Sequence, residues 1–230
     1  PARALPPAPS CLAALHAARG HMSGRLFAEH TQPDVRGVRR MIDAIRTAYT
    51  QRLPDLPWLD AAARADARAK LHGLQAHIGA PAQPDAMDAD AIEAWYADLH
   101  IGDAHWANVL AARMHAHQHA WSLLGGELPR GSLGARRTTA ARAAYSALDN
   151  ALVCPAGLLQ LPFYERDAPM YLQYGALGTL LAHEMTHAID TPGRWYDADG
   201  RWRTVRPATR HASTAARLDG LARSYEAWRA

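Results

Sequence analysis

The chain has 230 residues, a hydrophobic content of 49% and a formal net charge of only +3. This length suits one large domain or two small ones, with room for a sizeable core. No apolar run approaches the roughly 20 residues that a membrane-spanning helix needs. The small charge, without a recognised binding module, argues against nucleic acid as a partner.

The two cysteines, Cys11 and Cys154, lie far apart in the sequence, which favours free thiols over a disulfide. The N-terminal residues contain no apolar segment of the kind that signal peptides carry. We therefore slightly favour a cytoplasmic protein, and an exported mature form fits the sequence as well.

Helical spacing of apolar residues predicts that the first part of the chain is mainly helical. The predicted helices cover about residues 11–27, a segment capped by Asp34, a segment from Asp60 to about 77, residues 89–99 and residues 103–124. The second of them carries an apolar stripe that we expect to be buried: Val38, Met41, Ile42, Ile45 and Tyr49. The last two supply further core candidates, namely Trp95, Tyr96, Trp106, Val109, Leu110, Met114, Trp121 and Leu124.

The region from 144 to 164 differs, because Tyr145 and residues 151–154 have strand character. Residues 155–162 read as an extended edge segment, to which a peptide substrate could add as a further strand. A helix follows and ends near 191–193. A final helix is predicted over about 213–228, with Leu218, Leu221, Tyr225 and Trp228 on one face.

Residues 183–187 read HEMTH, an instance of the pattern H-E-x-x-H. On a helix, His183 and His187 share one face, so both imidazoles can bind one tetrahedral Zn²⁺. Glu184 is then placed to take a proton from the attacking water, and Asp190 can hold the other ring nitrogen of His187. The alternative is an amphipathic helix with two surface histidines, but the small, apolar flank at 175–182 predicts a buried helix and favours the metal site.

A second histidine group, His115, His117 and His119, lies on the predicted helix over 103–124. A solvated helix face is the simpler interpretation of this group, and adventitious metal binding is the alternative.

Five segments resemble, in order, the neprilysin and endothelin-converting-enzyme family of zinc metallopeptidases. They lie at 57–81, 150–164, 174–190, 193–200 and 220–228, and the most specific are PAGLLQ at 155–160 and the HEMTH motif. The resemblance implies a mainly α (α+β), thermolysin-like catalytic domain that is helical with a small edge β-sheet. It also implies a single, shortened domain over 1–230, with a helical portion at 1–140 and the edge strand, metal helix and final helix at 141–230.

The resemblance further implies peptide-bond hydrolysis with one Zn²⁺, His183 and His187 as ligands, Glu184 as general base and Asp190 as support for His187. The family's third ligand is a Glu, and an ungapped count places Ser213 at that position and Arg217 at the family's following Asp. A hydroxyl is a poor replacement for a carboxylate, and a guanidinium opposes cation binding. Asp219 or His211 could supply the ligand after a local backbone shift, so the third ligand stays open.

The family's substrate-binding segment, N-A-x-Y, corresponds to residues 142–145, which makes Arg142 and Ala143 candidate substrate contacts. Arg142 offers a guanidinium suited to a carboxylate, so either the preferred substrate is acidic or this contact is lost. Much of the family's N-terminal lobe and its C-terminal transition-state residues have no counterpart in this sequence. We expect that their functions are either missing or supplied by another chain, as a homo-oligomer or a completing partner chain would allow.

Two hypotheses follow from these observations. The first is a zinc-dependent hydrolase that cleaves a peptide or small amide. The second is a catalytically impaired pseudo-peptidase that acts by forming complexes. The intact set of His183, Glu184 and His187 favours the first by a narrow margin, and neither nucleic acid nor a membrane is an expected partner.

Overall fold

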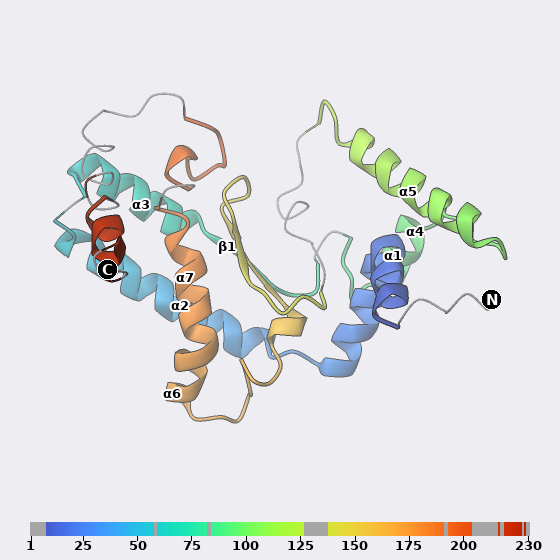
Figure 1. Ribbon diagram of the computed structural model, residues 1–230, viewed down its shortest axis with the longest axis horizontal. Helices are drawn as coiled ribbons and strands as arrows, with labels where there is room; N and C mark the ends of the chain where they lie inside the picture. Colours follow the sequence, from blue (N-terminus) through green and yellow to red (C-terminus); the bar gives the residue numbers. More distant parts are fainter. Residues whose placement is uncertain are drawn as a thin grey trace.

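A computed structural model describes residues 8–57, 59–81, 84–126, 138–190, 193–203, 216, 219–226 and 228. The chain is mainly helical with one small sheet, as predicted (Figure 1). The described α-helices are α1 (Ala8–Thr31), α2 (Val35–Arg52), α3 (Ala61–Gly73), α4 (Ala89–Trp95), α5 (His105–Ser122), α6 (Met170–Gln173) and α7 (Thr179–Thr186). No described helix combines the length and apolar character that crossing a membrane requires.

The sheet has three described strands in the order β1-β3-β2, so that β2 forms one edge. Strand β1 (Gln75–Gly79) pairs in parallel with β3 (Ala151–Pro155), with Gln75 opposite Ala151. Strand β2 (Ala144–Ser146) pairs antiparallel with β3, with Tyr145 opposite Leu152. The central strand β3 is almost wholly buried, and Cys154 within it is a free thiol whose pKa burial raises to about 12.

Helix α2 provides the main packing surface of the larger core. Asp34 caps it as predicted, because its carboxylate accepts a hydrogen bond of 2.9 Å from the N–H of Gly37. The predicted stripe is buried at Val38, Met41, Ile42 and Ile45 and packs with α3, β3 and α7. Burial of this apolar surface, about 25 cal/mol per Å², holds the helices around the sheet.

A smaller core joins α1, α4 and α5, on the side of the molecule opposite α3 in Figure 1. Its members include Ile92, Tyr96, Leu99 and Ala112. For most residues of the predicted helix over 103–124, the prediction of a core position is wrong. The following side chains are exposed: Trp106, Leu110, Met114, Trp121 and Leu124. The helix turns its other face, with Ala112 and His115, toward α1 and α4.

Two predicted boundaries in the sheet region are also wrong. The third helix ends at Gly73, and Gln75–Gly79 forms β1, because this segment finds backbone partners along β3. Residues 156–158 form a 3-10 turn in place of the expected extended edge. The N–H of Gly157 bonds to Thr138, and a Cβ at Gly157 would collide with the carbonyl of Thr139, so this segment is held in a tight turn.

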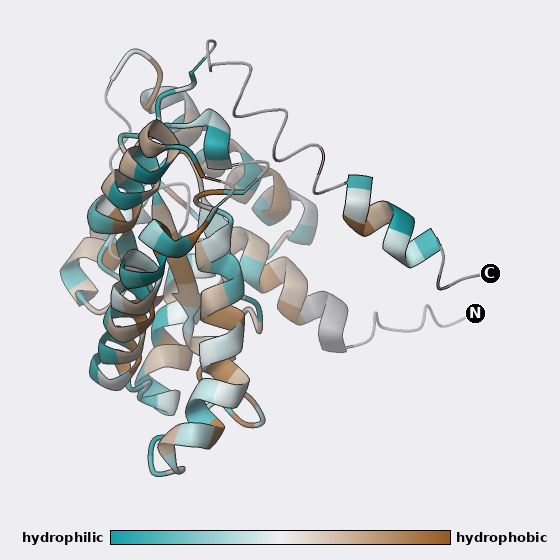
Figure 2. Cartoon of the chain, turned by 90° about the vertical axis from the view of Figure 1, so that its left-hand side faces the viewer, coloured by the Kyte–Doolittle hydropathy of each residue, from teal (hydrophilic) through white to brown (hydrophobic). Residues whose placement is uncertain are grey.

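The C-terminal helical segment, residues 219–226, stands apart from the body of the chain (Figure 2). Its apolar side chains Leu221 and Tyr225 are exposed, as is Trp228 just beyond it. Leu218, the fourth member of the face predicted there, lies outside the described side chains.

The chain's single lysine, Lys70, is buried near the C-terminal end of α3. Its Nζ donates a hydrogen bond of 2.9 Å to the carbonyl of Ala188 and another to the carbonyl of Gly193. Ala188 lies in the turn that follows α7, and Gly193 begins a 3-10 turn over Gly193–Trp195, so one ammonium from α3 is bonded to both segments.

Replacing Lys70 with Met should lower the free energy of unfolding by about 2–4 kcal/mol, because two buried carbonyls lose a charged donor. Denaturant unfolding followed by circular dichroism would measure the change. The matched control is Arg68→Met on the exposed face of the same helix, which should change stability by less than about 0.5 kcal/mol. Equal effects of the two substitutions would contradict this role of Lys70.

Candidate metal centre

The HEMTH motif lies at the end of a continuous helical segment that spans α6, a π-helical turn over Tyr174–Gly178 and α7. Leu177, Leu181 and Met185 are fully buried against the larger core. Because these three residues share one face of the helix, the opposite face of α7 points away from the core, and His183 is exposed there. The apolar flank therefore buries the helix as expected, while leaving the histidine face free.

The structure brings His183, Glu184 and His187 together, with one potential ligand atom from each within 4.8 Å of the others. The two imidazole rings are nearly perpendicular, with centroids 4.9 Å apart. Helix α7 ends at Thr186, earlier than predicted, because His187, Ala188 and Ile189 bond to carbonyls three residues back. His187 still keeps helical dihedral angles and stays on the face of His183.

Asp190 fixes the orientation of the second imidazole. Its Oδ2 lies 2.5 Å from Nδ1 of His187, which leaves Nε2 of that ring for a metal. Two imidazole nitrogens on one helix face are ligands that Zn²⁺ accepts, and the adjacent carboxylate of Glu184 lies where a metal-bound water would be. The residues present at this site therefore fit a zinc ion.

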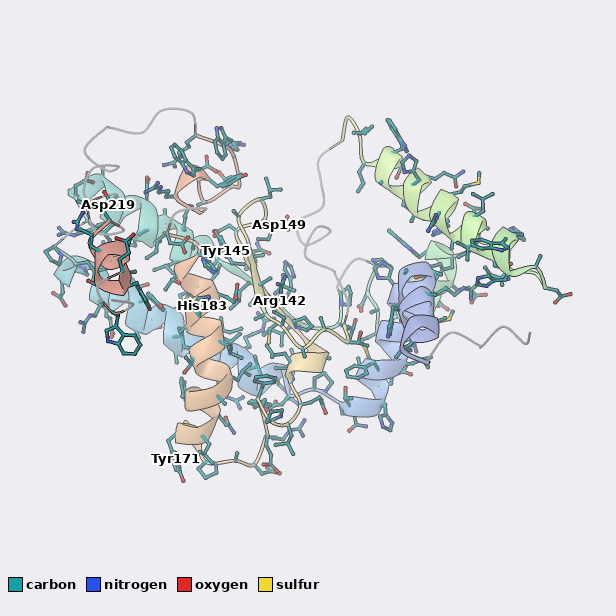
Figure 3. The ribbon with its side chains drawn as sticks, in the orientation of Figure 1. Arg142, Tyr145, Asp149, Tyr171, His183 and Asp219 are labelled. Atoms are coloured by element: carbon teal, nitrogen blue, oxygen red, sulfur yellow. The ribbon has the colours of Figure 1, made fainter. Side chains whose placement is uncertain are left out.

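The backbone of strand β2 holds the carboxylate of Glu184. The N–H of Tyr145 donates a hydrogen bond of 3.0 Å to Oε2 of Glu184. The hydroxyl of Tyr145 donates to Oδ1 of Asn150 at 2.9 Å, and Nδ2 of Asn150 donates to the carbonyl of Lys70 at 3.0 Å. Figure 3 shows Tyr145 beside His183, at the point where the sheet edge meets the helix.

Burial, together with the charge of Asp190, raises the pKa of Tyr145 well above its usual value. The phenol therefore stays neutral through the physiological range and keeps its proton for the bond to Asn150. Asn150 itself is fully buried and has a positive φ of 47°, a conformation that asparagine tolerates better than most residues.

Sequence reasoning missed the positioning roles of Lys70 and Asn150. Both lie in segments that resemble the family, yet neither is a metal ligand or a base, so motif chemistry did not single them out. The available signal for Lys70 was its position as the one lysine among 25 basic residues.

The structure does not place the other predicted site residues, the candidate third ligands and substrate contacts, beside the HEMTH motif. Ser213, Arg217 and His211 lie outside the described residues. Asp219 is exposed on the C-terminal helical segment and lies well apart from His183 in Figure 3. Near the edge strand, Arg142 is exposed and Ala143 is buried, and both directly precede β2.

Comparison with known proteins gives the family. Two sequence profiles described as peptidase family M13 match this chain, one over residues 3–81 and the other over residues 142–229, and together they cover well over half of it. The chain belongs to peptidase family M13. Neprilysin-2 of Drosophila melanogaster is 32% identical over 167 residues, and an endothelin-converting enzyme homolog of Locusta migratoria is 34% identical over 161 residues.

These alignments cover 71% and 70% of this chain, and 21% and 22% of the two relatives. The chain thus spans about a fifth of the length of these M13 relatives. Among solved structures, the inhibitor complex of the zinc metalloprotease ZMP1 of Mycobacterium tuberculosis matches with a TM-score of 0.76 and 25% identity. It covers 89% of this chain and 30% of that one, so the M13 fold is shared over nearly all of this chain.

Asp190→Asn should weaken zinc binding by roughly 10- to 100-fold, because the ring of His187 loses the anion that orients it and raises its basicity. Competition with a zinc chelator would measure the affinity. Asp167→Asn, an exposed carboxylate in the loop before α6, is the control and should leave the affinity unchanged. An unaltered affinity in the Asp190 variant would show that this carboxylate does not support the metal ligand.

Proposed function

We propose that this chain is a zinc-dependent peptidase that hydrolyses peptide or amide bonds, with His183 and His187 as metal ligands. The observation that carries the proposal is the gathering of His183, Glu184 and His187 on one face, with Asp190 bonded to His187. Membership of peptidase family M13 supports the same reaction.

Bound Zn²⁺ would supply Lewis acidity, which lowers the pKa of water to about 7 and polarises a substrate carbonyl. Glu184 would act as general base, accepting the proton of the attacking water and passing it to the leaving amine. The N–H of Tyr145 occupies one lone pair of Oε2, which restrains the carboxylate while leaving Oε1 available for the proton.

The edge strand β2 offers a place for the substrate backbone. In an antiparallel pair, alternate residues point their backbone groups to opposite sides. Tyr145 directs its N–H to Glu184, away from β3, so Ala143, two residues earlier, should direct its backbone groups to the same side. An extended peptide that paired there would pass directly beside the general base.

Arg142 suggests the kind of substrate. It is exposed immediately before Ala143, so its guanidinium can reach a substrate side chain or C-terminal carboxylate beside the edge strand. We therefore propose a preference for peptides with an acidic group near the cleaved bond. His211, Ser213, a water or a completing partner chain would provide the third zinc ligand.

Glu184→Gln should lower the turnover number by at least about 10²- to 10⁴-fold while zinc content stays at the wild-type value, because the amide cannot accept the proton. Hydrolysis of a fluorogenic peptide library and elemental analysis would measure the two quantities. Glu165→Gln, an exposed carboxylate, is the control and should turn over normally. A Glu184 variant as active as wild type would exclude the general-base role, and zinc binding without turnover in wild type would favour the pseudo-peptidase.

Arg142→Glu should lower kcat/KM for peptides with an acidic residue by about 10-fold or more, since a charge-assisted contact becomes a repulsion. The same variant should leave kcat/KM for neutral peptides within about twofold. Equal losses on acidic and neutral peptides would place the role of Arg142 in structure and not in specificity.

A further inference from the structure

The outer face of α5, with the turn that follows it, carries a stripe of large apolar side chains that no described element covers. Trp106 is 80% exposed, Leu110 is 59% exposed and Trp121 is 60% exposed. Met114 and Leu124 are also more than half exposed. At 3.6 residues per turn, these five positions fall within an arc of roughly 80° around the helix axis. They form one continuous surface, which we call the α5 stripe.

The opposite face of α5 is the one that packs against the rest of the chain. Ala112 is buried there, and so is His115, which is 7% exposed. The expectation that the histidines of this helix are solvated is therefore wrong for His115. His117 is exposed and lies within the α5 stripe, where its ring contacts Trp121 edge-on with centroids 5.7 Å apart. The packing of α5 within one chain therefore makes no use of the stripe.

The α5 stripe is large enough to form an interface. Large side chains such as Trp have about 150–250 Å² of surface each, so five that are more than half exposed present roughly 600 Å². An exposed apolar patch of this size usually marks an interaction site. Two such patches in contact would remove up to about 1,200 Å² from water, which is the lower end of what stable protein–protein interfaces bury.

The charge of α5 favours a second copy of the same helix as the partner. Residues 105–122 carry one formal charge, that of Arg113. A strongly charged partner would find almost no opposite charge on this helix to attract it. Two copies of α5 would meet with little charge repulsion, so the stripe can be buried against itself without a large electrostatic cost.

The centre of the stripe contains a hollow that a second copy can fill. This shallow hollow, of about 320 Å³, is lined by Arg113, Met114, His117 and Gln118. A two-fold axis midway between positions 115 and 116 exchanges Met114 with His117 and Arg113 with Gln118, so the four lining positions map onto themselves in an antiparallel pair. The flexible thioether of Met114 from each copy can then enter the hollow of the other, and each guanidinium lies opposite an uncharged amide.

The same axis pairs the large side chains toward the ends of the stripe. Leu110 lies opposite Trp121 of the second copy, and Trp106 lies opposite Leu124 of the second copy within one residue. Each indole therefore meets an aliphatic side chain. We propose that two copies of this chain pair through the α5 stripe, antiparallel about this axis. Helix α5 lies away from α7 in Figure 1, so the pairing leaves both HEMTH motifs accessible.

The test uses the full chain at about 100 µM, well above the micromolar dissociation constants of the weaker interfaces of this size. Light scattering should give twice the chain mass of 25.1 kDa. Trp121→Glu should raise the dissociation constant at least about 100-fold and return the mass to that of one chain, because pairing would bury a carboxylate in apolar surface. Tyr171→Glu, at an exposed aromatic side chain on α6, is the matched control and should stay paired.

Cysteine cross-linking tests the register in a Cys11→Ser background, in which the remaining Cys154 is buried. Met114→Cys lies close to the axis, so oxidation should link two copies through a disulfide. Trp106→Cys lies on the same stripe about nine positions from the axis, so at 1.5 Å per residue its two copies are roughly 28 Å apart and should stay unlinked.

A mass of one chain for the wild type at this concentration would overturn the proposal and leave the stripe to a different partner. A dimer that persists in the Trp121 variant, or a cross-link at position 106 as efficient as that at 114, would overturn it as well. The substituted side chains are exposed within one chain, so the variants should keep the wild-type circular-dichroism spectrum. If Trp121→Glu does not fold, the comparison of positions 114 and 106 decides. Because the readouts are mass and cross-linking, the result does not depend on the peptidase proposal.

Discussion

The geometry of the candidate metal centre depends on one buried charge, the ammonium of Lys70. A buried ammonium is costly unless it is fully hydrogen-bonded, and here the carbonyls of Ala188 and Gly193 accept from it. These carbonyls lie on either side of Asp190 in the sequence, and Asp190 is the residue bonded to His187. The requirement to satisfy Lys70 therefore restrains this part of the chain, which in turn orients the imidazole of His187. Gly193 is needed there because any Cβ would collide with the carbonyl of His187.

The same part of α3 reaches Glu184, the proposed general base, from the other side. The carbonyl of Lys70 accepts from Asn150, Asn150 accepts from Tyr145, and the backbone of Tyr145 donates to Glu184. The carboxylate of Glu184 is thus held by a sheet edge, while His187 is held through Asp190, and both supports meet at Lys70. A local change at Lys70 should therefore disturb Glu184 and His187 together.

The metal motif was readable from sequence because its chemistry depends on local spacing: His183 and His187 share a helix face whatever surrounds them. The cap at Asp34 and the buried stripe of α2 were predictable for the same reason. Strand β1 was not, because residues 75–77 are held by a partner 76 positions away in the sequence. The path from Lys70 to Glu184 was equally hidden, since two of its groups are the backbone carbonyl of Lys70 and the backbone N–H of Tyr145, which carry no side-chain signal.

Helix α5 was predicted correctly as a helix, but the face predicted to be buried is exposed. The hydrophobic pattern places Trp106, Leu110 and Trp121 in the core, yet these side chains are exposed and His115 is buried. Burying an imidazole costs desolvation, which the stack on Tyr96 and the bond to the Trp95 carbonyl offset in part. Apolar side chains of similar size would pack the same space at lower cost, so packing alone does not account for histidines on this face.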